Sequence, residues 1–170
     1  MWPLAERQRR QAFVALVGLM AVLAPVAALP ARAQGTIRFF SGSCGPGICT
    51  GCVYDSDSRS LLTGTNYLAQ LYVGAVGSRE EDLKAVDYPP VPFMSGLLAG
   101  CVNGGTYTLA GFPPRTQVFV QVRAWTEISG SSYEEAVQTG MSTMAFDHRF
   151  GKSNIIEVRL SDPDLGEAPW

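Results

Sequence analysis

The cysteines are the residues of this 170-residue chain whose spacing comes closest to a chemical site. Cys44, Cys49 and Cys52 lie close together, and Cys101 follows much later in the chain. The order Cys-x4-Cys-x2-Cys with a distant fourth cysteine is the spacing of plant-type [2Fe–2S] proteins. The glycines of CGPGICTGC would also let backbone amides turn toward cluster sulfides. An iron–sulfur or zinc site is therefore one hypothesis for this loop.

Disulfides are the hypothesis that the sequence favours for the same cysteines. If the mature chain begins at Gln34, only ten residues precede Cys44, whereas plant-type cluster folds place a hairpin and a helix before the first ligand. An even number of cysteines in an exported chain is typical of disulfide pairing. We therefore expect two disulfides and no metal or other cofactor, with free thiols as a further alternative.

The pairing of the cysteines depends on the turn at Pro46-Gly47. Proline presets φ and glycine allows φ > 0, so this dipeptide fits the centre of a type II turn. Such a turn places Cys44 opposite Cys49 with a Cα separation that suits a disulfide, and leaves Cys52 to pair with Cys101. Since type II is not the turn that a twisted hairpin prefers, the pairing of Cys44 with Cys52 and of Cys49 with Cys101 stays open.

Other motifs that could carry chemistry are incomplete. Residues 55–59, DSDSR, begin like a calcium loop but lack its next ligand and its glycine. Gly151-Lys152-Ser153 ends like a phosphate loop, but Phe146 stands where that motif needs glycine. His148 is the single histidine and the chain has no Gly-x-Ser-x-Gly, so neither a catalytic triad nor a three-histidine zinc site is supported. We expect no catalytic residue.

Aromatic side chains are the remaining candidates for ligand binding. Trp125 shares one face of its predicted strand with Gln121 and Arg123, whose side chains could donate to hydroxyl groups. We treat these three residues as a candidate ligand-binding face, for example for a polysaccharide, although aromatic residues more often cover a core. The aromatic set that could line such a face is Tyr67, Tyr72, Phe119, Trp125 and Tyr133.

The element that must position these residues is a strand over residues 116–125, TQVFVQVRAW. Valine and alanine alternate with glutamine and arginine, which indicates a half-buried strand near the centre of a sheet. Asn103-Gly104 predicts a hairpin between residues 98–102 and 106–109. Further strands are expected at residues 36–40, 53–55, 67–73, 83–86 and 154–160. These elements predict an all-β fold, an antiparallel β-sandwich of Ig-like or jelly-roll-like type.

One short helix is expected at residues 133–138. Ser131 and Ser132, each followed three residues later by glutamate, form a doubled capping box. Gly140 is expected to end the helix. The remainder of residues 34–170 shows no repeat and no linker, so we expect a single domain whose C-terminal tail is mobile from about residue 161.

The first 33 residues have the pattern of a signal peptide. Arginines at positions 7, 9 and 10 precede an apolar run over residues 12–29, and Ala31-Arg32-Ala33 supplies a cleavage site. The remaining chain has nine basic and fourteen acidic residues, a net charge of −5. Without a basic patch it is not expected to bind nucleic acid. We expect a secreted, periplasmic or extracellular protein with no membrane segment after cleavage.

A resemblance adds to this interpretation. The segments YLAQLY, VQVRAW and SSYEEA, with an Asn-Gly-Gly turn between the first two, resemble a group of secreted bacterial β-rich proteins, and the match covers residues 35–160. The group has no established activity, and many members carry a C-terminal sorting anchor. The sequence as a whole leads us to expect an exported non-catalytic β-sandwich that acts as a structural or surface-interaction module. Its partner would be a polysaccharide or a cell-surface protein; a carbohydrate-binding module and a small exported [2Fe–2S] protein are the alternatives.

Overall fold

The computed structural model describes residues 34–41, 43–45, 48–55, 59–143 and 149–169, without the side chains of 43–45, 48–50 and 143. The predicted leader, the Pro46-Gly47 turn, Asp57, Phe146 and His148 lie outside the described residues. None of the described helices is long and apolar enough to cross a membrane.

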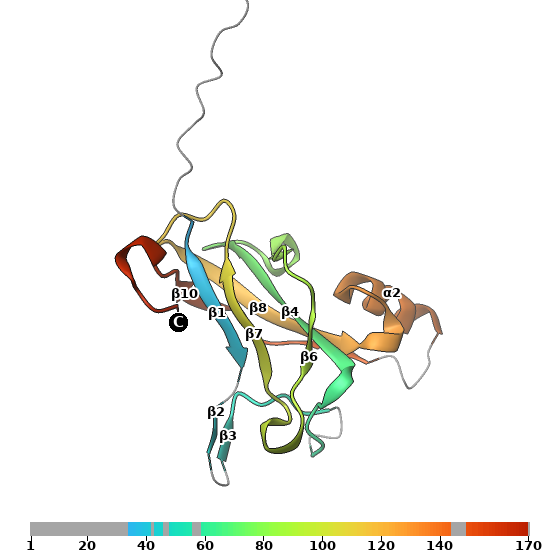
Figure 1. Cartoon of the computed structure of the whole chain (residues 1–170). Helices are drawn as coiled ribbons and strands as arrows, with labels where there is room; N and C mark the ends of the chain where they lie inside the picture. Colours follow the sequence, from blue (N-terminus) through green and yellow to red (C-terminus); the bar gives the residue numbers. More distant parts are fainter. Residues whose placement is uncertain (1–33, 42, 46–47, 56–58, 144–148, 170) are drawn as a thin grey trace, which may run out of the picture. The chain divides into compact units, whose positions relative to one another are not determined.

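Most of the described chain forms one antiparallel sheet, with strand order β1-β7-β6-β4-β8-β10 (Figure 1). β5 pairs with β4. β9 pairs with residues 123–125 of β8, and β10 pairs with residues 117–120 of the same strand. A separate ribbon of β2 and β3 follows β1. The strands are β1 (Thr36–Ser41), β2 (Ser43–Gly45), β3 (Ile48–Thr50), β4 (Gly64–Ala75), β5 (Lys84–Ala85), β6 (Val91–Phe93), β7 (Val102–Thr108), β8 (Gln117–Thr126), β9 (Phe150–Lys152) and β10 (Ile156–Arg159).

The sheet curls until its first and last strands meet. Thr36 at the start of β1 forms an antiparallel bridge with Ser161, just after β10, through two backbone hydrogen bonds of 3.1 and 2.9 Å. The inner faces of the sheet thereby pack against one another around the core. The residues of this core come from different strands of the curled sheet and include Phe39, Leu71, Val118 and Val120. This arrangement confirms the predicted all-β, sandwich-like fold with one short helix.

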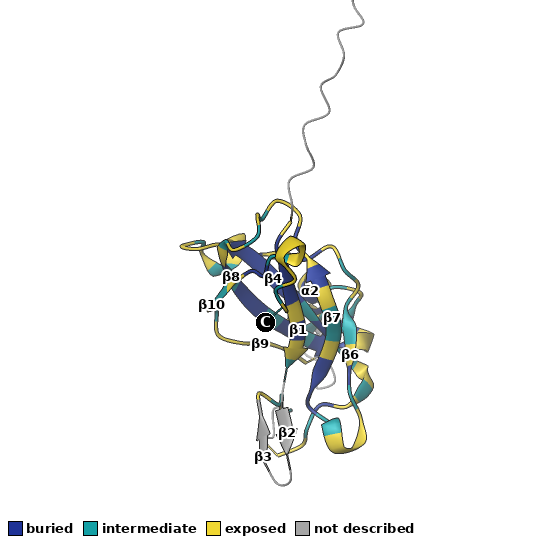
Figure 2. Ribbon diagram, turned by 60° about the vertical axis from the view of Figure 1, so that its left-hand side comes forward, coloured by how far each residue is buried: buried dark blue, intermediate teal, exposed yellow. Residues whose placement is uncertain are grey.

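Helix α2 (Tyr133–Thr143) packs on the outer face of β8 and reaches β4 through the hydrogen bond between Tyr72 and Glu134. Figure 2 shows that β8 and β4 are largely buried. Side chains on this face form a second apolar cluster that includes Tyr72, Trp125, Tyr133 and Ala136. Both faces of β8 are therefore covered, which explains why apolar and polar residues alternate along it while all of them except Gln117 are buried or partly buried.

The capping of α2 follows the prediction in part, because Glu135 takes part in it while Glu134 binds Tyr72 and Arg123, and the helix is longer than predicted. Ser132 Oγ accepts from the backbone N–H of Glu135 at 3.2 Å, and the carboxylate of Glu135 accepts from the backbone N–H of Ser131 at 2.8 Å. The helix continues through Gly140 to Thr143. Glycine ends a helix when the chain turns left-handed there, and Gly140 has no positive φ.

Asn103-Gly104 does not form the predicted hairpin. These residues lie inside β7, where the register with β1 shifts: Phe39 pairs with Gly105 and Phe40 pairs with Asn103. Gly104 is the extra residue of this bulge. A Cβ atom on it would lie 2.3 Å from the Tyr107 hydroxyl, so close packing, rather than a turn, requires glycine there.

The C-terminal residues from 161 to 169, for which a mobile tail is predicted, make several contacts with the rest of the domain. Ser161 is buried and bridges to β1, and its hydroxyl donates to the carbonyl of Ala168 at 2.8 Å. The guanidinium of Arg115 lies 2.6 Å from the carboxylate of Glu167. The backbone of Arg115 has a φ of 64°, which is rare for a residue with a side chain. The 3-10 helix η4 (Pro163–Leu165) lies between these contacts.

Candidate functional site: a mixed aromatic and ionic pocket

The predicted ligand-binding residues of β8 lie beneath other elements, and this corrects the idea of an open face. The exposed fractions of Gln121, Arg123 and Trp125 are 2%, 9% and 1%. The indole N–H of Trp125 donates to the carbonyl of Gly130 at 2.9 Å, and its ring packs edge-on against Tyr133. Trp125 and Arg123 thus contact the segment that begins α2, and none of the three side chains forms a binding face open to solvent.

Arg123 is the centre of a satisfied polar cluster below α2. Its guanidinium carbon lies 4.0 Å from the centroid of the Tyr72 ring and 5.2 Å from that of Tyr133. Nη1 lies 3.3 Å from the Glu134 carboxylate, and Nε donates to Gln121 Oε1 at 3.0 Å. The buried cation is thus matched by a carboxylate and two aromatic rings, as a buried charge must be.

Gln121 extends this cluster to Glu80, which lies in the 3-10 helix η1 (Glu80–Asp82), and to β9. Its Nε2 donates to Glu80 Oε1 and to the carbonyl of Ser153, both at 2.8 Å. Lys152 Nζ lies 2.6 Å from the same Glu80 oxygen. Hydrogen bonds from Lys152 and then Gln121 lower the pKa of Glu80 below its ordinary value. Glu80 therefore stays ionised near neutral pH and balances the charge of Lys152.

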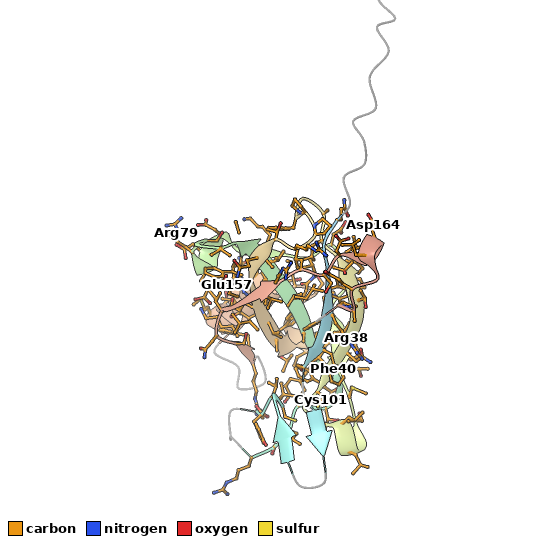
Figure 3. All side chains as sticks on the ribbon, turned by 90° about the vertical axis from the view of Figure 1, so that its left-hand side faces the viewer. Arg38, Phe40, Arg79, Cys101, Glu157 and Asp164 are labelled. Atoms are coloured by element: carbon orange, nitrogen blue, oxygen red, sulfur yellow. The ribbon has the colours of Figure 1, made fainter. Side chains whose placement is uncertain are left out.

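The two predicted cysteine pairs, Cys44 with Cys49 and Cys52 with Cys101, have different outcomes in the structure. Cys44 lies opposite Cys49 in the backbone register of β2 and β3, which is the arrangement that the predicted disulfide needs, but their side chains lie outside the described set, so the disulfide itself stays a prediction. Cys52 and Cys101 are also neighbours, but their sulfurs lie 3.7 Å apart, well beyond the bond length of about 2.05 Å. The predicted Cys52–Cys101 disulfide is therefore not formed in this structure. Cys101 is buried near the end of the sheet from which the β2-β3 ribbon extends (Figure 3).

Among the described side chains, no group of three or more histidine, cysteine or acidic residues could hold a metal ion. The side chains of Cys44 and Cys49 do not belong to this described set. The [2Fe–2S] hypothesis therefore gains no support from the part of the loop that the structure describes.

A pocket of about 450 Å³ lies where β9 and the segment 52–55 approach β8. Its volume is within the range of small-molecule sites. The lining combines aromatic, charged and small apolar residues: Tyr54, Tyr67, Trp125 and Phe150; Asp55, Arg149, Lys152 and Ser153; and Cys52, Val53, Leu62, Val122, Ala124 and Gly151.

An ion pair joins the two segments that form the pocket. Arg149 Nη1 contacts Asp55 Oδ2, and the Tyr67 hydroxyl donates to the same carboxylate oxygen at 3.3 Å. Burial, and then the nearby charge of Asp55, raise the pKa of Tyr67 above its ordinary value, so this hydroxyl remains a donor. The pocket thereby holds a carboxylate, a guanidinium and a phenol within contact of one another.

Two aromatic rings of the lining remain open to solvent. Tyr54 is 49% exposed and Phe150 is 41% exposed. Phe150 pairs with Trp125 across β9 and β8, and its ring lies edge-on to Tyr133 at 6.1 Å. It is therefore supported from behind while part of its surface stays accessible.

The sequence patterns did not identify this pocket, although they drew attention to two of its segments. Asp55 begins the incomplete calcium loop and Gly151–Ser153 ends the incomplete phosphate loop. Asp55 and Arg149 are 94 positions apart, and no local pattern reports a contact of that separation. Trp125 is the one member of the predicted ligand face that lines the pocket.

Comparisons of the chain with protein-family models, with curated proteins and with solved structures find no match. The pocket and the polar cluster must therefore be interpreted from their own chemistry.

Proposed function

We propose that the protein is an exported, non-catalytic binding module whose functional site is the pocket between β8, β9 and the segment 52–55. The observation that carries this proposal is the composition of the pocket. Exposed rings at Tyr54 and Phe150 stand beside a fixed ion pair in a cavity large enough for a small molecule or the end of a polymer. Apolar surface with a few placed polar groups is the usual make-up of a ligand site.

The ion pair supports binding rather than catalysis. Asp55 is the only acidic residue among the described lining residues, and it is held by Arg149 and Tyr67. Glycoside hydrolysis, for example, uses two carboxylates on opposite sides of the reacting bond. A single carboxylate that already accepts from two donors is suited to fixing a ligand, not to transferring protons.

Export is supported by the sequence of residues 1–33, which has a basic start, an apolar run and a small-residue cleavage site. We expect cleavage after Ala33. Mass spectrometry of protein recovered outside the cytoplasm measures this directly, and a mature chain that retains residues 13–29 would contradict it.

Binding at the pocket is tested with a variant that fills it. Gly151 lines the pocket, and a Cβ atom on it would meet no described atom within 4 Å, so the side chain of Gly151→Phe begins in open space. Ala85→Phe, on exposed β5, adds the same ring elsewhere and is the control. A library of small polar compounds, oligosaccharides and peptides is screened by the fluorescence of Trp125, in a chain whose residues 1–33, including Trp2, have been removed and which carries Trp170→Phe.

We expect compounds that change the fluorescence of the parent protein and of Ala85→Phe but not that of Gly151→Phe. Loss of the response in both variants, or in neither, would argue against the pocket as the site.

A further inference from the structure

From the pairing of charges in the pocket we infer that its ligand is an uncharged saccharide, held by ring stacking on Phe150 and Tyr54 and by hydroxyl contacts to Asp55 and Arg149. This inference rests on the proposed function, because it names the ligand class of the same site. It also moves saccharide binding from the buried face of Trp125, Gln121 and Arg123 to a different set of side chains.

The charged side chains of the lining already balance one another, so an ionic ligand is not the best match for the pocket. Each cation of the lining already has a carboxylate partner: Arg149 contacts Asp55, and Lys152 Nζ lies 2.6 Å from Glu80. Glu80 remains ionised because its pKa is lowered. An anionic ligand would have to compete with these carboxylates, and a cationic ligand would meet two positive charges. A neutral ligand disturbs neither pair.

The polar groups match hydroxyls. Asp55 offers carboxylate oxygens that accept, while Arg149 offers a fork of N–H groups that donate. A hydroxyl group both donates and accepts, so two adjacent hydroxyls of one sugar ring can use the carboxylate and the guanidinium together. The side chain of Asp55 is 15% exposed and that of Arg149 is 43% exposed, so part of the pair is accessible to solvent.

The aromatic part of the pocket lining matches the C–H face of a sugar ring. Phe150 and Tyr54 both line the cavity and are partly exposed, so a ligand that covers them would bury apolar area that is otherwise in water. A purely apolar ligand would bury the same rings but would also remove water from Asp55 and Arg149 without replacing its hydrogen bonds, which costs free energy. A ligand with one apolar face and a polar rim satisfies both groups.

The experiment is isothermal titration calorimetry of the purified protein with three probes of matched length: a neutral gluco-oligosaccharide, a uronic-acid oligosaccharide and a long-chain fatty acid. The variants are Phe150→Ala, Tyr54→Ala, Asp55→Asn and the pocket-filling Gly151→Phe. Met141→Ala, an exposed apolar residue on α2 outside the pocket lining, is the control, and thermal unfolding verifies that each variant is folded.

We expect the neutral oligosaccharide to bind and the other two probes to bind at least about tenfold more weakly. Loss of one stacking ring or of the Asp55 charge should weaken binding roughly tenfold, which corresponds to about 1.4 kcal/mol. The Met141→Ala variant should bind like the parent protein. Tyr54→Ala keeps the test informative if Phe150→Ala fails to fold.

Two results would overturn the inference while leaving the proposed function intact: preferential binding of the uronate or of the fatty acid, in either case abolished by Gly151→Phe. Saccharide binding that Gly151→Phe, Phe150→Ala and Asp55→Asn all leave unchanged would overturn both, because the site would then lie elsewhere.

Discussion

The guanidinium of Arg123 is held between the Tyr72 ring, 4.0 Å from its centroid, and the carboxylate of Glu134, 3.3 Å from Nη1. The Tyr72 hydroxyl donates to the same Glu134 carboxylate at 2.9 Å. β8, β4 and α2 thus meet at one cation, and the position of the helix on the sheet depends on it.

We expect Arg123→Met to lower the free energy of unfolding by about 2–3 kcal/mol, because it leaves buried acceptors without their donor. The expected loss in free energy of unfolding is smaller than for a fully buried ion pair, because the side chain of Glu134 is 62% exposed. Arg79→Met, at a 72% exposed arginine in an ion pair with Glu81, should change it by less than about 1 kcal/mol. Urea unfolding followed by circular dichroism measures both, and equal effects would contradict a special role of Arg123.

Val120 and Ile156 form a matched pair for testing the core. They are direct partners in the register of β8 and β10, yet Val120 is 3% exposed and Ile156 is 57% exposed. Val120→Asp should unfold the domain, because an unpaired buried charge costs several kcal/mol, a large part of the roughly 5–15 kcal/mol total. Ile156→Asp should leave thermal unfolding nearly unchanged. Similar melting temperatures for both variants would show that the inner face of β8 is misassigned.

Trp125 is predicted to contribute to stability rather than to bind sugar by itself. Trp125→Ala should cost about 3–5 kcal/mol, as large-to-small changes in a core do. Trp125→Phe keeps a ring but loses the donor to Gly130, so its cost should be nearer 1–2 kcal/mol. Leu97→Ala, at a 97% exposed side chain, is the control for truncation. A small effect of Trp125→Ala on denaturant unfolding would count against this interpretation.

Alkaline pH should destabilise the fold through its tyrosines. Burial, and then the hydrogen bond to Glu134, raise the pKa of Tyr72 above its ordinary value. The neutral form is favoured in the folded state, so its contribution is complete below the unfolded pKa of about 10 and is lost as the pH rises above it. Stability measured between about pH 8 and 11 should therefore fall.

Tyr72→Phe should reduce that alkaline slope without removing it, because burial also raises the pKa values of Tyr107 and Tyr133. An unchanged slope in this variant would assign the alkaline loss to other groups. Tyrosinate absorbance recorded during the titration shows whether ionisation accompanies unfolding.

Acid should loosen the C-terminal residues. The hydrogen bond from Arg115 holds the pKa of Glu167 below its ordinary value. A lowered folded pKa contributes stability that is present above the unfolded value and is lost as the pH falls through the folded one. Proteolysis of the tail should therefore accelerate below the ordinary glutamate range in the parent protein. In Glu167→Gln the tail should already be cleaved faster at neutral pH, with little further change in acid; Glu157→Gln on β10 is the control (Figure 3).

The sequence determined much of the strand and helix content, because those elements follow from local patterns. The alternation of Val118 and Val120 with polar neighbours identified β8, and Ser132 with Glu135 identified the start of α2. The stiffness of valine side chains and the capping of free N–H groups act within a few residues. These elements can therefore be predicted from the order of the residues alone.

Only the tertiary structure decided which of these residues are buried together. Asn103-Gly104 has the composition of a turn, yet the packing of Phe39 and Tyr107 makes it a bulge within β7. The pocket depends on the contact between Asp55 and Arg149, which lie far apart in the chain and meet because β9 adds to β8 beside the segment 52–55. Contacts of this kind join residues distant in sequence, and a local pattern carries no information about them because their energy is shared by both partners.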